Sequence, residues 1–220
     1  MTSMKPEAPT TRGKILVEAS RLFKERGYYG ASTREIARAV GIRQQSLKHH
    51  FATKQAILEE LLSYTVTEPL RIAQNMQASK GSPAVRLYAY VYFDVTHLHH
   101  APYSLQGLFG TYLLAEPDLV KWYQCASDIY DAVTAMVAEG VAAGEFREID
   151  PEFAAAAVGA LVEQTINVFE QYGANPDVPS LVADFVLSGL LRDSMMLVQI
   201  RERACRVDPA LPNLSNDSLV

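Results

Sequence analysis

Apolar residues recur every three or four positions along most of this 220-residue chain, which is the period of helices that bury one face. The pattern predicts helices over residues 12–27, 32–41, 43–51, from 54 onward, 83–99, 117–143, 150–173 and 179–205. No segment alternates between apolar and polar residues for long enough to require a strand. The sequence therefore predicts an all-α fold.

Several helix boundaries carry explicit signals. Ser32 stands three residues before Glu35, a capping box that opens a short helix, and Gly41 ends that helix. Thr53 is expected to cap the long helix that follows, and Pro69 inside that helix predicts a kink or a break. The second and third helices are therefore short and joined by a tight turn.

Charge is distributed unevenly along the chain. The net charge is −5, yet residues 1–62 hold 11 Lys and Arg against 6 Asp and Glu, whereas the remainder holds 9 against 19. The first part thus carries +5 and the rest −10. Cationic side chains supply most of the non-specific affinity of proteins for DNA phosphates, so the first part suits DNA. Ordinary variation of solvated surface charge would also explain the difference, and charge alone leaves both interpretations open.

Residues 32–51 have the layout of a helix-turn-helix: a capped helix, a turn at Gly41 and a short polar helix. The third helix has only Leu47 and Phe51 as apolar residues, which leaves its other faces free for contacts. We expect it to enter the major groove, where Arg can pair with guanine and Gln with adenine. The candidate DNA contacts are, at base edges, Arg43, Gln44, Gln45 and Ser46; at phosphates, Lys48, His50 and Lys54; and, without a specified partner, Thr33, Arg34 and His49.

Residues 11–62 resemble the DNA-binding domain of the TetR (tetracycline repressor) family of transcriptional regulators. The stretches that carry the resemblance are ILVEASRLFKERGYYGASTREIARAVGI and SLKHHFATKQAIL, and GEFREIDPEFAA at 144–155 is similar to a phrase common before the family's dimerising helices. The resemblance implies a three-helix DNA-binding head, a fourth helix leading into a larger helical ligand-binding and dimerisation domain, a two-fold dimer and a palindromic operator. The expected domains are 1–10, a disordered arm; 11–62, the helix-turn-helix domain; 63–206, the ligand-binding and dimerisation domain; and 207–220, a flexible tail.

Two residues of the third helix depart from the family pattern. Lys48 stands where the family usually has a tyrosine, and Arg43 stands where a small N-capping residue is common. Both changes add positive charge, so DNA binding is still expected. The operator sequence therefore stays open.

Aromatic residues with polar tips, which are typical of ligand pockets, concentrate between residues 88 and 130. The resemblance implies that an effector binds among the helices of this region. The candidate ligand contacts are Tyr88, Tyr92, His97, Phe109, Tyr112, Trp122 and Tyr123. Each of them also fits a plain core position. We expect a lipophilic or aromatic effector that shifts the fourth helix, with Pro69 as a weak point, and so lowers operator affinity.

The last two long helices carry more apolar residues than the edge of a single chain should expose. The resemblance implies a four-helix dimer interface here, and the alternative is that these residues only fill the core of one chain. The candidate dimer contacts are Leu161, Phe169, Phe185, Leu190 and Met195. A homodimer also suits DNA, because recognition helices about 34–36 Å apart reach successive turns of one duplex face.

Catalytic and metal-binding chemistry has little support. No G-x-S-x-G, P-loop or G-x-G-x-x-G motif occurs, so we expect neither an enzyme nor a bound cofactor. Asp94, His97 and His100 share one helix face, but we expect no metal there. The spacing of the two cysteines, the absence of a signal peptide and the lack of an apolar membrane span predict a cytoplasmic protein.

The sequence thus predicts a homodimeric repressor whose partners are double-stranded operator DNA and a small-molecule effector. Two alternatives stay open, namely an effector-independent regulator and a protein-interaction adaptor that uses the same helical head. A steep loss of duplex affinity with salt would distinguish a DNA-binding protein from an adaptor.

Overall fold

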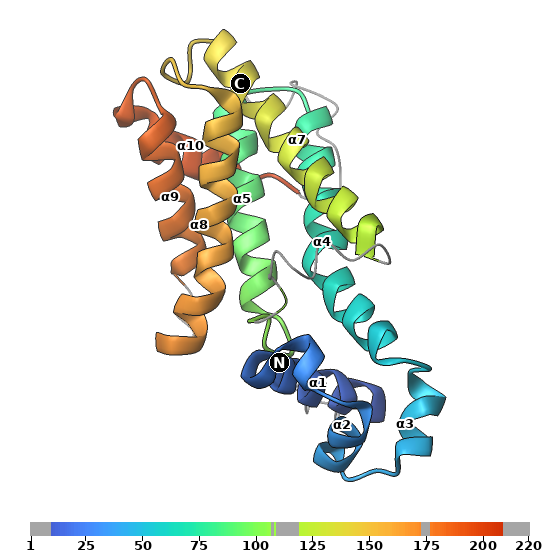
Figure 1. The fold of residues 1–220 in the computed structure, drawn as a ribbon. Helices are drawn as coiled ribbons and strands as arrows, with labels where there is room; N and C mark the ends of the chain where they lie inside the picture. Colours follow the sequence, from blue (N-terminus) through green and yellow to red (C-terminus); the bar gives the residue numbers. More distant parts are fainter. Residues whose placement is uncertain (1–9, 107, 109–118, 173–176, 209–220) are drawn as a thin grey trace. The chain divides into compact units, whose positions relative to one another are not determined.

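The computed structural model describes residues 10–106, 108, 119–172 and 177–208, without the side chains of residues 168–172. Within these ranges the secondary structure is helical, apart from one isolated β-bridge, which confirms the predicted all-α class (Figure 1). The described residues form two compact units. The N-terminal unit ends at Tyr64 and includes residues of 101–119, and the C-terminal unit joins Thr65–His100 with the residues from Val120 onward.

The N-terminal unit is built from α1 (Thr11–Gly30), α2 (Thr33–Val40), α3 (Gln44–His50) and the beginning of α4 (Lys54–Ala78). One apolar stripe from each helix fills a common core. The large buried side chains of this core include Ile15, Phe23, Ile36, Leu47, Ile57 and Leu61. Gly27, predicted to close the first helix, has φ 71° and ψ 165° and therefore interrupts α1 in a kink.

The predicted start and stop signals of α2 and the predicted cap of α4 are confirmed. The Ser32 hydroxyl accepts a hydrogen bond from the Glu35 amide at 3.3 Å, and the Glu35 carboxylate accepts one from the Ser32 amide at 3.0 Å. Gly41 ends α2 in the left-handed conformation, with φ 78°. The Thr53 hydroxyl accepts a hydrogen bond from the Ala56 amide at 3.0 Å and so caps α4.

The break considered at Pro69 does not occur, because α4 continues as a helix to Ala78. A proline in a helix interior costs roughly 3 kcal/mol. The turns after it bury Ile72, Ala73 and Met76, and each large apolar side chain removed from water contributes about 1.5–3 kcal/mol. Burial on the far side of the proline therefore holds the helix together.

The C-terminal unit contains the remainder of α4 together with α5 (Pro83–His99), α7 (Val120–Ala142), α8 (Pro151–Tyr172), α9 (Val178–Leu190) and α10 (Leu197–Ala204). Helix α5 lies at its centre and contacts α7, α8, α9 and α10. Its first nine residues, Pro83–Val91, are all buried for this reason. As predicted for this segment, α5 begins with Ser82 as cap and Pro83 as its first residue.

The prediction of one final helix over 179–205 is wrong. Helix α9 ends at Leu190, Leu191 is extended with ψ 137°, and a short 3-10 turn at Ser194–Met196 leads into α10. The cause lies in another part of the chain. Phe146 forms a β-bridge with Leu191, and its ring is completely buried.

Backbone hydrogen bonds on both sides of this bridge fix the interruption. The Arg147 amide donates to the Leu190 carbonyl at 2.9 Å, and the Arg192 amide donates to the Glu145 carbonyl at 3.0 Å. Asp193 then caps the following turn by accepting from the Met195 amide at 2.9 Å. Helical periodicity continues across Leu191, so the period alone did not reveal a break that a distant segment imposes.

Candidate functional site

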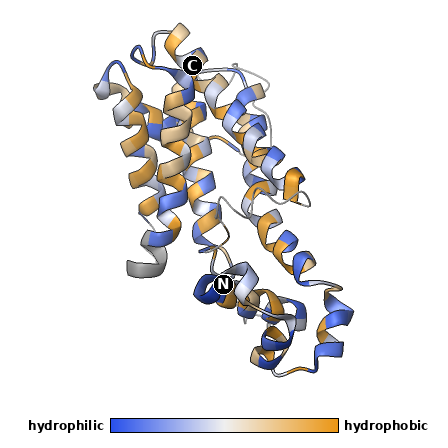
Figure 2. Ribbon diagram, in the orientation of Figure 1, coloured by the Kyte–Doolittle hydropathy of each residue, from blue (hydrophilic) through white to orange (hydrophobic). Residues whose placement is uncertain are grey.

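The third helix presents its polar side chains outward, as a DNA-reading helix must. Leu47 is completely buried and anchors α3 to the core of the N-terminal unit. Gln44 and Ser46 are half-buried. The exposed candidates of this segment are Arg43, Gln45, Lys48, His49 and His50. Figure 2 shows the same pattern, because α3 is mostly hydrophilic.

Helix α2 braces α3 across the Gly41 turn. The Gln44 side-chain amide donates a hydrogen bond of 3.1 Å to the hydroxyl of Thr33, so two of the candidate DNA contacts are joined to each other. Arg34, the next residue of α2, is exposed. The hydrogen bond to Thr33 fixes the side chain of Gln44. Gln45 is exposed to solvent and has no hydrogen bond or ion pair among the described residues.

Arg12 is a positioning residue that the sequence reasoning missed. Its Nη1 atom donates to the His50 carbonyl at 2.7 Å, its Nε atom donates to Glu60 at 3.0 Å, and its guanidinium lies 4.1 Å from the centre of the Phe51 ring. Arg12 therefore ties α1 to the C-terminal end of α3 and to α4. Its cationic charge there also complements the negative end of the α3 dipole.

Lys54 has internal partners in the structure. Its ammonium donates to the carbonyls of Tyr28 at 2.7 Å and Ala31 at 2.9 Å and lies 4.2 Å from the centre of the Tyr28 ring. Burial lowers the pKa of Lys54 from its ordinary value. The lysine holds the end of α1 against the start of α4, and its contact with phosphate stays a prediction.

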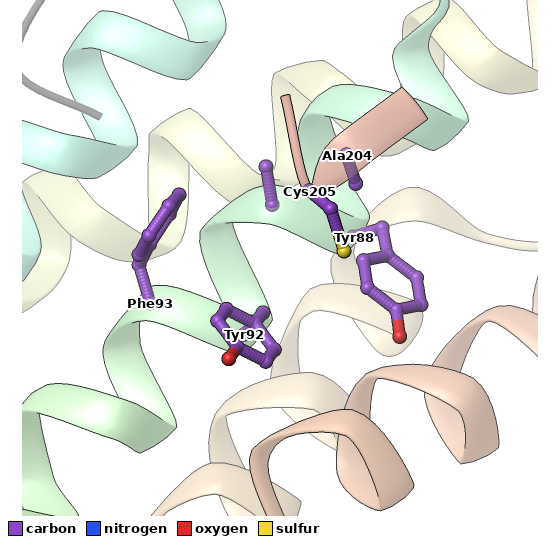
Figure 3. A pocket seen from close by; sticks show the side chains of 6 residues that line it. Tyr88, Tyr92, Phe93, Ala204 and Cys205 are labelled. Carbon is purple, nitrogen blue, oxygen red and sulfur yellow. The ribbon is translucent and has the colours of Figure 1, made fainter. Parts of the chain in front are cut away.

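Two of the candidate ligand contacts line one pocket of the C-terminal unit. Tyr88 and Tyr92 of α5 meet Cys205, at the end of α10, around a volume of about 190 Å³ (Figure 3). The Tyr88 hydroxyl donates to Asp184 at 3.0 Å, and Asp184 also pairs with Arg201. Burial and the contact with Asp184 raise the pKa of Tyr88 well above its ordinary value. The polar end of this pocket is therefore already satisfied inside the protein.

The other candidate ligand contacts do not line this pocket. His97 and Trp122 are half-buried on α5 and α7, and Tyr123 is 56% exposed. Phe109 and Tyr112 lie outside the described residues. The structure therefore brings together Tyr88 and Tyr92 but not the full set of aromatic candidates.

Two buried charged residues of α5 were not among the candidate ligand contacts. Arg86 is 5% exposed and Asp94 is 6% exposed. Asp94 accepts a hydrogen bond of 2.8 Å from the hydroxyl of Tyr90, which lies one helical turn before it. Charged residues are rarely this buried. A charged residue within the otherwise apolar run of α5 was therefore the sequence signal that could have identified these two positions.

The apolar surface of α8 and α9 is concentrated on one groove of about 170 Å³. Three residues that line this groove are exposed: Phe153 (67%), Phe185 (70%) and Leu161 (36%). Leu190, another candidate dimer contact, also lines the groove but is buried within its own chain, and Met195 is 82% exposed on the turn before α10. The side chain of Phe169 lies outside the described residues. Figure 2 shows α9 as hydrophobic over most of its length.

Neither a three-residue metal-binding cluster nor a membrane-spanning helix occurs in the described ranges. No three His, Cys, Asp or Glu side chains there are grouped so that they could hold a metal ion. The Nδ1 atom of His100 lies 2.7 Å from the Thr96 carbonyl, which gives that ring a partner on its own helix. No described helix is both long and apolar enough to cross a bilayer.

Comparisons with known proteins agree with the geometry of the N-terminal unit. Residues 15–61 match the family model described as bacterial regulatory proteins, tetR family. The chain is also similar to the HTH-type transcriptional repressor KstR2 of Mycobacterium tuberculosis, with 34% identity over 92 residues. That match covers 41% of this chain and 46% of KstR2, so it spans about half the length of that relative.

Similarity to solved structures extends over both units. AmtR of Mycobacterium smegmatis is 30% identical, the match covers 94% of this chain and 100% of AmtR, and the TM-score is 0.75. AibR, solved in complex with isovaleryl coenzyme A and operator DNA, shares the fold at 20% identity, with 83% of this chain and 98% of AibR covered and a TM-score of 0.65. By the family match at its N-terminal unit and its similarity to the whole of AmtR, this chain belongs to the tetR family of bacterial regulatory proteins.

Proposed function

We propose that this protein is a transcriptional repressor, without enzymatic activity, that binds a palindromic operator as a homodimer in the cytoplasm. A small lipophilic or aromatic effector releases it from DNA. The observation that carries the proposal is α3, a short helix held by one buried leucine, Leu47, with Gln45, Lys48 and His49 exposed. Polar and cationic side chains placed in this way read base edges and phosphates in the major groove.

The groove between α8 and α9 supports the dimer. A phenylalanine side chain buries at least 150 Å² when it is removed from water, and Phe153 and Phe185 are both mostly exposed in the single chain. A second copy of the same groove would cover them in a two-fold arrangement, which is the commonest symmetry of homo-oligomers. Two copies of α3 would then face two half-sites of one duplex.

Effector binding has support from the related regulators. The AibR structure combines isovaleryl coenzyme A with operator DNA, and its helical fold is shared by this chain. A 100-fold loss of operator affinity requires only about 2.7 kcal/mol of difference in effector affinity between the DNA-binding state and the released state. A buried small molecule supplies a difference of this size.

Selection from a genomic library tests the proposal. Purified protein is incubated with fragmented genomic DNA, bound fragments are sequenced, and the affinity for the recovered site is measured by fluorescence anisotropy between 50 and 200 mM KCl. We expect a palindromic site, two chains per duplex and an affinity loss of about 10³–10⁵-fold over this salt range. An adaptor that docks on proteins would enrich no DNA sequence, and any affinity it had for duplex DNA would not fall steeply with salt.

A further inference from the structure

The carboxylate of Asp94 is buried without a cationic partner among the residues that the structure describes. Asp94 is 6% exposed, and its one hydrogen bond comes from the hydroxyl of Tyr90, which is itself 3% exposed. An ionised carboxylate removed from water is costly unless an opposite charge or several donors replace its hydration. A single neutral hydroxyl replaces only a small part of it.

Arg86, the other buried charged residue of α5, lies eight residues before Asp94 and bonds to two other helices. Arg86 Nη1 donates to the α4 carbonyls of Met76 at 3.1 Å and Gln77 at 3.0 Å, and Nη2 pairs with Glu139 of α7. Arg86 therefore lies between α4 and α7. The two ends of the Arg86 guanidinium are engaged, and its Cα lies about 12 Å along the helix from that of Asp94, so it does not neutralise the carboxylate.

His97 lies about one turn beyond Asp94 on α5. The pKa of Glu68 of α4 is lowered mainly by the hydrogen bond from Arg71 and, to a smaller extent, by His97. The end of α4 is bonded to Arg86 through the carbonyl of Met76, and Glu68, two turns earlier in α4, lies within electrostatic range of His97. Asp94 lies between these two positions of α5.

Helix α7, which also contacts α5, contributes two further buried polar atoms. The indole Nε1 of Trp122 and the hydroxyl of Thr134 have no hydrogen-bond partner among the described residues. Buried donors without partners are uncommon in folded proteins. On α5 the carboxylate is flanked by the buried side chains of Leu87, Val91 and Leu98. The interior around α5 thus combines unmet polar groups with apolar side chains.

We propose that Asp94 is the recognition residue of the effector site and that the effector is a lipophilic compound with a protonated amine. This inference rests on the proposed function. The ammonium supplies the missing opposite charge, and its N–H groups donate to the carboxylate that Tyr90 orients. An effector that presents a carboxylate or phosphate at this position would be repelled by Asp94, which separates this regulator from one that senses anionic compounds.

The electrostatics of the isolated chain agree with this assignment. Burial raises the pKa of Asp94 from 3.8 to about 6, although the hydrogen bond from Tyr90 lowers it. At neutral pH the carboxylate is therefore mainly ionised. A bound cation would stabilise the ionised form further.

Probes that share one hydrocarbon skeleton and differ in their polar group test whether the site prefers a cationic ligand. The full-length protein is titrated with 2-phenylethylamine, 2-phenylethanol and 3-phenylpropanoate, and with hexylamine, hexanol and hexanoate, by calorimetry and by release of operator DNA. We expect the amines to bind and release DNA, and the alcohols and acids to bind at least about tenfold more weakly. An equal or stronger response to the alcohols or acids, or no response to either amine, overturns the proposal.

Variants identify the residue responsible. Asp94→Asn should weaken amine binding by about tenfold or more, which is the cost of losing a charged hydrogen bond, while Asp131→Asn, at an exposed carboxylate of α7, should leave it unchanged. Tyr90→Phe, which keeps the ring, should weaken amine binding by roughly threefold and serves if Asp94→Asn does not fold. An amine affinity that survives both changes overturns the proposal.

Operator binding without any probe separates this inference from the proposed function. If the wild-type protein and Asp94→Asn bind the operator equally while no amine affects either, only the amine assignment is wrong. If the wild-type protein binds no operator at all, the proposed function is wrong.

Discussion

Gln45 and Lys48 are adjacent on the exposed side of α3 and differ in what they contribute to DNA binding. Gln45→Ala should relax sequence preference at one base pair in each half-site by about 1–3 kcal/mol, because a bidentate contact with adenine is lost. Lys48→Ala should weaken binding to all sequences alike and reduce the slope of log affinity against log salt by about 1 for each chain. Anisotropy titrations against operator variants at several KCl concentrations measure both effects. A loss of sequence preference in Lys48→Ala, or a uniform loss of affinity with a smaller salt slope in Gln45→Ala, would contradict the assignment of Gln45 to a base and Lys48 to a phosphate.

Asp94 should make the stability of the protein depend on pH. Its pKa is about 6 in the folded chain and 3.8 in its ordinary state, so the folded chain holds the proton more tightly. Stability contributed by the protonated carboxyl is therefore present below about pH 4 and is lost as the pH rises through about 6. One pKa unit corresponds to about 1.4 kcal/mol, which gives a loss of about 3 kcal/mol.

The comparison of wild-type protein with Asp94→Asn isolates this contribution from the titration of other groups. Urea unfolding at pH 4.5, 5.5, 6.5 and 7.5 should show the variant gaining stability relative to the wild type as the pH rises. The same difference at every pH would mean that the carboxyl titrates at its ordinary value in the folded chain.

The exposure of single residues in the candidate site could be predicted from the sequence where it depends on neighbouring positions in the chain. The basic and amide side chains of α3 follow from the amphipathic pattern around Leu47, and the structure leaves Gln45 and Lys48 exposed. Lys54 shows the limit of that reasoning. Its internal hydrogen bonds to Tyr28 and Ala31 depend on the folded path of the chain after α1, which no local pattern reveals.

At the scale of elements, Gly140 of α7 is required by its close approach to Phe146. A Cβ atom at Gly140 would lie 2.1 Å from a ring carbon of Phe146, whose ring is completely buried. Gly140→Ala should therefore destabilise the chain by about 3 kcal/mol, although alanine favours a helix. Thermal or urea unfolding measures the change.

Gly41 provides the comparison for this prediction. Its φ is 78°, but an added Cβ would have no atom within 4 Å, so Gly41→Ala carries only the backbone cost of about 1 kcal/mol. The larger loss should belong to Gly140→Ala. An equal or reversed order would show that the ring of Phe146 is free to move.

The same elements show which parts of the fold follow from local sequence. The capping box of α2, the Gly41 turn and the cap at Thr53 each depend on residues within four positions, and all were predictable. The end of α9 at Leu190 was not predictable, because residues 145–147, more than forty positions earlier in the chain, bond to the residues at that end. Of the two outcomes predicted at Pro69, a kink or a break, the break does not occur for a related reason, since tertiary burial overrides the local preference of proline.

At the scale of the whole molecule, the exposed side chain of Phe185 should determine the oligomeric state. Phe185→Asp places a charge in the groove between α8 and α9, where a partner would bury it. We expect a monomer by sedimentation velocity and an operator affinity at least about 100-fold lower, because one recognition helix then binds alone.

Val120→Asp is the matched control, because Val120 is also apolar and 59% exposed but lies outside that groove. It should remain a dimer with unchanged operator affinity. Dimers of Phe185→Asp would locate the interface elsewhere on the chain.

Genomic occupancy tests most directly whether α3 inserts into duplex DNA. Gln45 and Lys48 have no hydrogen bond or ion pair within the described part of the chain, so their joint replacement by alanine should leave folding intact. Chromatin immunoprecipitation of the wild-type protein and of the double variant at equal protein levels should show loss of nearly all bound sites in the variant. Unchanged occupancy in a folded double variant would contradict the account.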